Sequence, residues 1–308
     1  EQVQFDSHGE LTGLNDVGGH DAIYRRKTTV AEIASGAFPV GSQLSVTDRG
    51  DAKFDLIAGG VFDGYSVLDA GNGNTAVLST YSINGIRAYA NIIDNTTDIT
   101  PIVEAALSYQ GAVAITKGSY YSAGMITIGA NQAVFLDNQV TITKFSNKTT
   151  NSEPVFWLNG SFAQLVGASF SSSRVISENN SLDGVVLVGH RTMLSSHANV
   201  NYCTVNGVRI SSWTPFGQTD TSTDRCLVVQ NPQFGGLTSY FHNIKDLLLE
   251  DSNVGMEFRG WSNAILGGNI HGFRLGNANA GIAAFIWVRG GLDNAITDCF
   301  FHQSTDSA

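Results

Sequence analysis

From residue 111 onward the chain consists of short apolar runs, mostly of three to five residues, separated by turns rich in Gly, Asn, Ser and Asp. Runs of this length are too short for helices and match short β-strands. The pattern therefore predicts an all-β domain, built either from two packed sheets or from stacked coils. The runs lie at 113–115, 125–128, 133–136, 140–142, 155–158, 163–166, 184–188, 207–210, 227–229, 244–249, 255–258, 264–266, 286–288 and 295–297.

Internal repeats distinguish these two folds. The tripeptide Asn-Ala-Ile begins at Asn263 and again at Asn294, 31 residues later, and Asn243 begins a similar unit 20 residues before Asn263. A unit of this size with two or three short strands fits one coil of a parallel β-solenoid, in which each coil buries apolar residues against the next. A β-sandwich or jelly roll would instead require longer strands joined by hairpin turns. We therefore predict a solenoid.

The composition fits a solenoid and excludes several other classes. The 308 residues include 34 Gly but only 5 Pro, which fits many turns and central strands whose N–H groups are needed for pairing. Only 14% of residues are charged, as expected where stacked coils would place like charges about 4.8 Å apart. The net charge of −10 and the dispersed Lys and Arg exclude a dedicated nucleic-acid binder. No apolar run approaches the roughly 18 residues of a membrane span.

Two helices are predicted in the first 110 residues. The first covers 28–36, with Thr28 or Thr29 as N-cap, Glu32 completing a capping box and Gly36 ending the helix. The second covers about 98–108, with Asp98 or Thr100 as N-cap. It starts with Pro101 at the first helical position and carries one apolar stripe, formed by Ile102, Val103, Ala106 and Leu107.

The domain organisation follows from these elements. Residues 1–27 are polar and form a linker or the remnant of a preceding module. Residues 28–86 form a small β-rich module, with strands at 44–46, 54–57, 66–68 and 76–78. Residues 87–308 form the solenoid, and we expect the C-terminus to be truncated.

The residues at the start of the solenoid resemble a known family. A turn at 94–100 (DNTTDIT) leads into a helix with Ala-Ala-Leu at 105–107, and a strand turn follows at 116–120 (TKGSY). This order resembles the opening of the pectate-lyase-like β-helix of bacteriophage tailspikes and tail fibres. The family pattern has Gly, Asp and Pro where this chain has Asn95, Ile99 and Thr116. Residues 27–78 are similar to the small module that often precedes that helix.

The resemblance implies a right-handed parallel β-helix whose helix at 98–108 caps the core. It also implies a homotrimer on a phage virion tail, assembled in the host cytoplasm and attached to other tail proteins through the N-terminal region. The implied function is recognition of a host surface polysaccharide, either capsule or lipopolysaccharide, with no cofactor. The sequence leaves open whether the polysaccharide is also cleaved by hydrolysis or elimination. Alternatively, the chain is a structural tail adaptor whose receptor-binding or enzymatic part lies beyond residue 308.

Glycan hydrolysis needs two carboxylates, roughly 5–5.5 Å apart for retention or about 6.5–9.5 Å apart for inversion, and neighbouring coils can supply them. Our catalytic candidates are Glu257, Asp251 and Asp298. Glu257 alternates with two apolar residues, so we expect it to face outward. Aligning the repeat units at their Asn residues places Asp251, His271 and His302 in one column. Polar residues at a solvated turn, or an exposed Glu–Arg pair, would explain the same pattern without catalysis.

The candidates for substrate binding are mostly aromatic. Trp261 and Arg259 follow Glu257, and Trp261 would stack on a sugar ring. Trp213 and Tyr240 belong to the irregular insertion 211–242, since long loops on a rigid scaffold often carry binding sites. His271 completes this set. Packing in a trimer seam is the alternative role for the aromatic residues.

Metal binding is not predicted. The histidines lack ligand spacing, and Asp94 and Asp98 fit turn and cap positions. No carboxylate cluster of the kind that binds calcium in free-standing pectate-lyase-like enzymes is visible. The three cysteines, Cys203, Cys226 and Cys299, are odd in number and are predicted to be buried free thiols.

Overall fold

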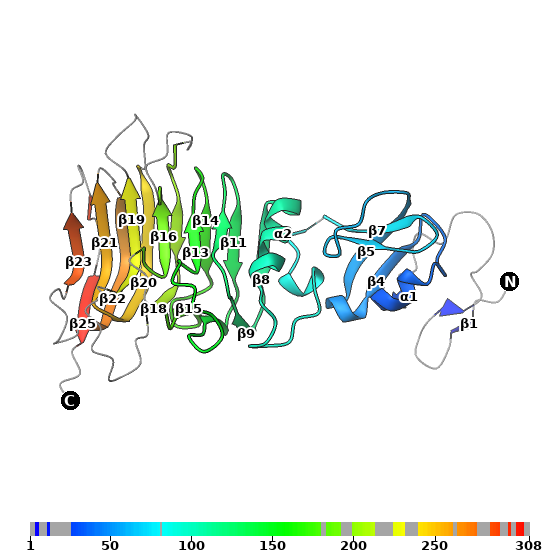
Figure 1. Ribbon diagram of the computed structural model, residues 1–308, viewed down its shortest axis with the longest axis horizontal. Helices are drawn as coiled ribbons and strands as arrows, with labels where there is room; N and C mark the ends of the chain where they lie inside the picture. The colour runs from blue at the N-terminus through cyan, green and yellow to red at the C-terminus, as the bar shows by residue number, and fades with distance from the viewer. Residues whose placement is uncertain are drawn as a thin grey trace. The chain divides into compact units, whose positions relative to one another are not determined.

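The computed structural model describes residues 4–5, 11–12, 26–80, 82–179, 183–191, 199–212, 224–231, 240–260, 264–275, 284–289, 295–296 and 300–304 (Figure 1). The chain divides into two compact units, Glu1–Asn91 and Ile92–Ala308. Among the described residues, no helix has both the length and the apolar character needed to cross a membrane.

The N-terminal unit is a small mixed sheet with one short α-helix. Its five strands run in the order β3-β4-β5-β7-β6, and only β3 and β4 are parallel. The strands are β3 Arg26–Thr28, β4 Gln43–Val46, β5 Ala52–Ala58, β6 Val67–Asp69 and β7 Asn74–Leu78. A separate antiparallel pair, β1 Gln4–Phe5 and β2 Leu11–Thr12, precedes them. Two 3₁₀ turns, η1 Thr47–Arg49 and η2 Ile86–Ala88, complete the unit.

The first predicted helix is confirmed as α1, Val30–Ala34. Thr29 is its N-cap, and the Thr29 and Glu32 side chains form the reciprocal capping box. Gly36 follows the C-cap with a φ of 72°, a conformation that glycine adopts without strain.

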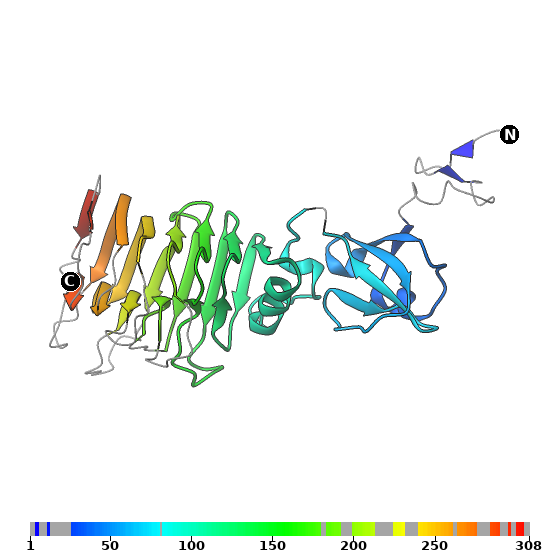
Figure 2. The ribbon, with the colours of Figure 1, turned by 90° about the horizontal axis from the view of Figure 1, so that it is seen from above.

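The second unit is a stack of coils whose strand segments form three parallel columns, and the last described coil, with β24 and β25, contributes to the first two columns (Figures 1 and 2). The first column contains β8 Ala112–Ile115, β11 Ala133–Leu136, β14 Gln164–Gly167, β17 Thr204–Asn206 and β24 Ala295–Ile296. The second contains β9 Gly118–Tyr121, β12 Val140–Lys144, β15 Ser173–Ser177, β18 Arg209–Ser212 and β25 Phe300–Ser304. Two longer strands, β20 His242–Ser252 and β22 Ala264–Leu275, run through both columns.

The third column is a six-stranded parallel sheet in the order β10-β13-β16-β19-β21-β23. Its strands are β10 Ile126–Ile128, β13 Phe156–Leu158, β16 Val186–Gly189, β19 Arg225–Asn231, β21 Val254–Gly260 and β23 Ala284–Arg289. These stacked parallel sheets confirm the predicted β-solenoid and not the alternative β-sandwich.

The core consists of apolar residues that stack on the same register position of successive coils. In the third column Phe156, Val186, Leu227 and Met256 are aligned in the ladder and fully buried. Because side chains alternate along a strand, the residues between them point to the opposite side of the sheet. That outward side carries the polar residues described below.

The second helix, α2, spans Thr100–Gln110 and packs against β8 and β10 of the first coil. Its predicted apolar stripe is buried, so the helix covers the core at this end, as expected for a solenoid cap. The N-cap differs from both predictions because it is Ile99, which makes no side-chain cap. Asp98 acts one residue earlier, where its carboxylate accepts hydrogen bonds from the Thr100 and Ala123 N–H groups, 3.0 and 2.9 Å away.

Both cysteines in the described part of the chain, Cys203 and Cys226, are buried and free, as predicted. Burial raises the pKa of each thiol to about 12. Cys299 lies outside the described residues.

Candidate functional site

The outward side of the six-stranded sheet carries two adjacent columns of side chains. Register aligns Val228 of β19 with Glu257 of β21 and Trp287 of β23. Two residues further along each strand, it aligns Gln230 with Arg259 and Arg289. We name the charged group on this side the arginine network; its members are Glu153, Asp183, Arg191, Arg225, Glu257, Arg259 and Arg289.

Glu257 is the buried centre of one end of the network. Its side chain is 0% exposed, and three guanidinium groups surround it. Arg259 Nη2 donates to Glu257 Oε2 at 3.0 Å, and Arg289 Nη1 lies 3.4 Å from Oε1. Arg225 Nε donates to the same carboxylate. A buried carboxylate is tolerated only with such partners, so Glu257 and its arginines form one structural unit.

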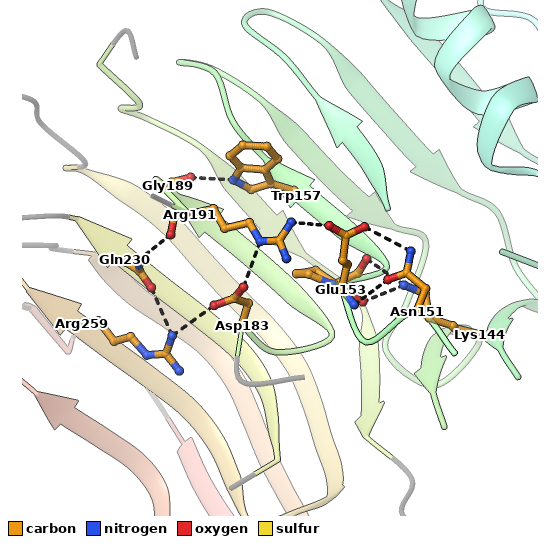
Figure 3. Close-up of polar contacts among 10 residues, drawn as sticks. Lys144, Asn151, Glu153, Trp157, Asp183, Gly189, Arg191, Gln230 and Arg259 are labelled. Carbon is orange, nitrogen blue, oxygen red and sulfur yellow. Dashed lines mark hydrogen bonds and ion pairs between the residues drawn. The ribbon is translucent and has the colours of Figure 1, made fainter. Parts of the chain in front are cut away.

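Arg259 connects this centre to the rest of the network, and Figure 3 shows its contacts with Asp183 and Gln230. Its Nη1 lies 3.4 Å from Asp183 Oδ1 and donates to Gln230 Oε1 at 3.2 Å. Asp183 Oδ2 in turn accepts a hydrogen bond from Arg191 Nε at 3.0 Å, and Arg191 Nη1 donates to Glu153. The network thus extends along five neighbouring strands or their flanking turns, β13, β16, β19, β21 and β23.

The charges of the network depend on these contacts. The hydrogen bond from Arg191 lowers the pKa of Glu153, and the hydrogen bonds to Glu153 and Asp183 outweigh burial and raise the pKa of Arg191. Burial lowers the pKa of Arg225 to about 10, aided by repulsion from the guanidiniums of Arg259 and Arg289. Arg225 therefore still carries its charge at neutral pH.

A buried lysine lies at the other end of the network. Lys144 Nζ donates to the backbone carbonyls of Glu153 and Pro154 at 2.6 and 3.1 Å (Figure 3). Burial lowers its pKa to about 8. Lys144 thereby fixes the turn that presents the Glu153 carboxylate.

Two tryptophans flank the network. Trp157 Nε1 donates to the Gly189 carbonyl at 2.8 Å, which fixes the indole across neighbouring coils (Figure 3). The Trp287 ring lies between two arginines, with the guanidinium carbons of Arg289 and Arg225 at 4.7 and 5.6 Å from its centroid. Partly exposed indole and guanidinium groups provide apolar surface and N–H donors, the contacts that carbohydrates accept.

The structure brings together two of the predicted site residues, Glu257 and Arg259. The register is consistent with the predicted outward direction of Glu257, since Met256 and Phe258 align with the buried core residues Leu227 and Val229. The carboxylate is nevertheless buried rather than exposed, because arginines from neighbouring coils cover it.

Asp251 and His271 lie elsewhere, in the second column of the 12-stranded sheet. Asp251 accepts a hydrogen bond from Ser211 Oγ at 3.1 Å, and the His271 ring lies 5.5 Å from the ring of Phe170. Beside Asp251, Glu250 is fully buried and paired with Arg209. Their catalytic and binding roles stay predictions.

The predicted column of Asp251, His271 and His302 is wrong in part. The ladder does pair His271 with His302, but it pairs His271 with Leu248 on the other side. The repeat alignment assumed that the Asn residues mark equivalent positions. Asn243 instead pairs with Ile265, and the register shifts once more between Lys245 and Leu247. This irregularity at Asp246, whose φ is 52°, was not visible in the sequence.

Tyr240 lies at the turn before β20, next to a ladder of aromatic rings. Phe162, Tyr202 and Phe241 stack with centroids 5.2 and 5.4 Å apart, and Tyr240 contacts Phe241 edge to face. All three stacked residues have left-handed φ angles of 63°, 59° and 59° and are about half exposed. Trp213, Trp261 and Asp298 lie outside the described residues.

Sequence reasoning missed five of the seven members of the arginine network, Glu153, Asp183, Arg191, Arg225 and Arg289, and both flanking tryptophans, Trp157 and Trp287. One signal was present for Trp287 and Arg289. The pentapeptide Met-Glu-Phe-Arg-Gly at 256–260 recurs as Ile-Trp-Val-Arg-Gly at 286–290. Aligning these segments pairs Arg259 with Arg289, as the ladder does. Glu153, Asp183 and Arg191 lie outside the strands, whereas Trp157 lies in β13 and Arg225 begins β19.

Within the part of the chain that the structure describes, no group of three or more His, Cys, Asp or Glu residues could hold a metal ion. The site is therefore described by arginine, carboxylate and tryptophan side chains alone.

No protein-family model matches the chain, and no curated protein matches it. Among solved structures, it is similar to the tailspike protein gp49 of Acinetobacter baumannii bacteriophage Fri1, a capsular polysaccharide depolymerase. The identity is 10%, the TM-score is 0.36, and the match covers 92% of this chain and 64% of that one. Tailspike protein 2 of an Escherichia coli O157:H7 bacteriophage matches with 12% identity and a TM-score of 0.33, covering 91% of this chain and 51% of that one. Its enzymatically active domain matches with 13% identity and a TM-score of 0.32, covering 90% of this chain and 56% of that one.

Proposed function

We propose that the chain is a subunit of a bacteriophage tailspike or tail fibre and that it binds a host surface polysaccharide on the outward side of its six-stranded sheet. The observation that carries the proposal is the arginine network with its two flanking tryptophans. It lies on the rigid strands of the solenoid and presents indole rings and guanidinium donors at fixed positions. The tail-protein assignment rests on the motif resemblance at 87–128.

Binding fits the three carboxylates of the arginine network better than cleavage does. A glycosidase needs one carboxyl group that keeps its proton near neutral pH to act as the general acid. Glu153, Asp183 and Glu257 are instead each paired with arginine and hold these arginines in place. The pKa of Glu153 is lowered by its hydrogen bond from Arg191, which makes it a poor proton donor.

The implied assembly is a right-handed β-helix in a homotrimer. The half-exposed ladder of Phe162, Tyr202 and Phe241 supports a subunit contact, since ring edges exposed on three successive coils form an apolar ridge. Light scattering of the purified chain would test the trimer.

The function is tested with the 308-residue chain and surface polysaccharides extracted from a panel of bacterial strains, by biolayer interferometry. We expect binding to the polysaccharide of at least one strain, and we expect Trp157→Ala and Arg259→Gln to weaken it. Absence of binding across the panel, or binding unchanged in both variants, contradicts the proposal. Appearance of new reducing ends or of ultraviolet-absorbing products would add an enzymatic function. Binding that appears only in a longer chain would favour the adaptor alternative.

A further inference from the structure

We infer that the bound polysaccharide is acidic and that Arg289 receives a carboxylate or another oxyanion substituent of one of its sugars. This inference rests on the proposed function and specifies its substrate class.

Exposure places the positive charge outermost at this end of the network. The Arg289 side chain is 53% exposed, whereas its partner Glu257 is 0% exposed. A ligand approaching from solvent therefore meets the guanidinium and not the carboxylate. This arrangement presents a positive group on a chain whose net charge of −10 repels polyanions overall.

Arg289 is held from two sides by other groups. Its guanidinium lies over the Trp287 ring at 4.7 Å, and its Nη1 lies 3.4 Å from Glu257 Oε1. A guanidinium has five N–H donors in one plane, so a single contact to Glu257 engages only part of the group. Trp287 acts as a positioning residue, because stacking holds the planar group with its edge available for a two-point contact to an oxyanion.

The negative charge of Glu257 is divided among three arginines. Arg225 and Arg259 share the carboxylate with Arg289. Those two arginines have other acids nearby: Asp224 acts on Arg225, and Asp183 pairs with Arg259. In the described part of the chain, Glu257 is the one carboxylate paired with Arg289. Three arginines thus face three acids at this end of the network, and Arg289 is the most exposed of the three guanidinium groups, so it is the one that an anionic ligand reaches from solvent.

Arg209 provides a matched control on another sheet. It is 31% exposed and also pairs with a fully buried carboxylate, that of Glu250. Arg209, however, already makes a two-point contact to that carboxylate, from Nε and Nη2, whereas Arg289 makes a one-point contact to Glu257 from Nη1. The two arginines therefore differ in exposure and in how many of their N–H donors the buried carboxylate already uses.

The test titrates the full chain with D-glucuronate, methyl D-glucoside and inorganic sulfate, following tryptophan fluorescence and the NMR signals of the arginine side chains. We expect glucuronate to bind with a dissociation constant in the millimolar range and methyl glucoside to cause no change. Arg289→Gln should weaken glucuronate binding by about tenfold or more, whereas Arg209→Gln should leave it unchanged. Circular dichroism would check that both variants are folded.

A second experiment, with the polysaccharide itself, distinguishes this inference from the proposed function. A polysaccharide that binds in the strain panel is compared with its carboxyl-reduced form. Equal binding of both forms, with Arg289→Gln also without effect, overturns the inference and leaves the proposed function intact. Glucuronate binding with no polysaccharide bound contradicts the proposed function instead. Sulfate binding as tight as glucuronate binding, lost in Arg289→Gln, supports an oxyanion site and assigns it to sulfate- or phosphate-bearing sugars. If neither glucuronate nor sulfate binds, the inference is overturned.

Discussion

Glu257 and Glu250 are buried glutamates on different sheets of the solenoid, and the arginines that neutralise them differ in exposure. Both side chains are 0% exposed and both pair with arginines from neighbouring coils. Around Glu257 one arginine, Arg225, is itself only 3% exposed. Around Glu250 both arginines, Arg174 and Arg209, are partly exposed. The first cluster is thus a buried ionic centre, and the second is a buried acid covered by solvated cations.

The largest expected effect is that of Glu257→Ala. Removing this carboxylate leaves the Arg225 charge buried without its main counter-ion, which should lower the free energy of unfolding by about 3–5 kcal/mol. Urea denaturation followed by circular dichroism measures the change. A loss below about 1 kcal/mol would show that Arg225 reaches water in the variant, as an exposed ion pair would allow.

Lys144 is a buried cation whose hydrogen bonds in the described structure go to backbone carbonyls, so it shows how burial changes the pKa of an amine. Its folded-state pKa of about 8 lies below the usual value of 10.5, so between these pH values the unfolded chain binds more protons. Stability should therefore rise with pH across this window, by about 3 kcal/mol at most. Lys144→Met should remove that part of the rise, as measured by urea denaturation at a series of pH values. Parallel curves for wild type and variant would contradict the lowered pKa.

Glu250→Ala should cost less than Glu257→Ala. Its arginines can turn toward water, so the expected loss is about 1–3 kcal/mol, the cost of charge-assisted hydrogen bonds. The same denaturation measurement applies. Equal losses in the free energy of unfolding for the two variants would show that the exposure of the partner arginines does not control the cost of removing the carboxylate.

The aromatic ladder tests how stacking between uncharged outward residues contributes to stability. Tyr202 has a φ of 59°, which glycine tolerates better than other residues. Tyr202→Ala loses the stacking on both sides and keeps the strain, whereas Tyr202→Gly loses the stacking and relieves the strain. We expect the glycine variant to be more stable than the alanine variant by about 1 kcal/mol, the reverse of the usual order. An alanine variant more stable than the glycine variant would contradict a strained ladder.

Much of the fold could be predicted from the sequence because it depends on local patterns. The apolar runs predict nearly all strands of the second unit, and Thr29 with Glu32 predicts the cap of α1. The missed strands are β9, β15, β17 and β25, and the first three are rich in Gly, Ser, Thr, Asn or Tyr and lack a clear apolar run. Pairing with the strands of neighbouring coils stabilises these strands, and the sequence pattern does not show this pairing.

Little of the candidate site could be predicted, because it depends on register between coils. Glu257 and Arg259 were found since they are neighbours on one strand. Asp183 and Arg191 meet across a strand, and Arg225 meets Glu257 from another coil. One irregular residue such as Asp246 shifts the alignment of everything that follows, so spacing in the sequence cannot supply these contacts.

The arginine network takes its members from successive rungs, from the turn before β13 to β23. The spacing of its side chains is therefore set by the order of the rungs. Duplication or loss of a single rung between Glu153 and Arg289 would move the two ends of the site apart or together by about 4.8 Å, the distance between paired strands. Recombination that changes the number of rungs could thus alter the spacing of ligand contacts in one step, without any point substitution in the contacts themselves.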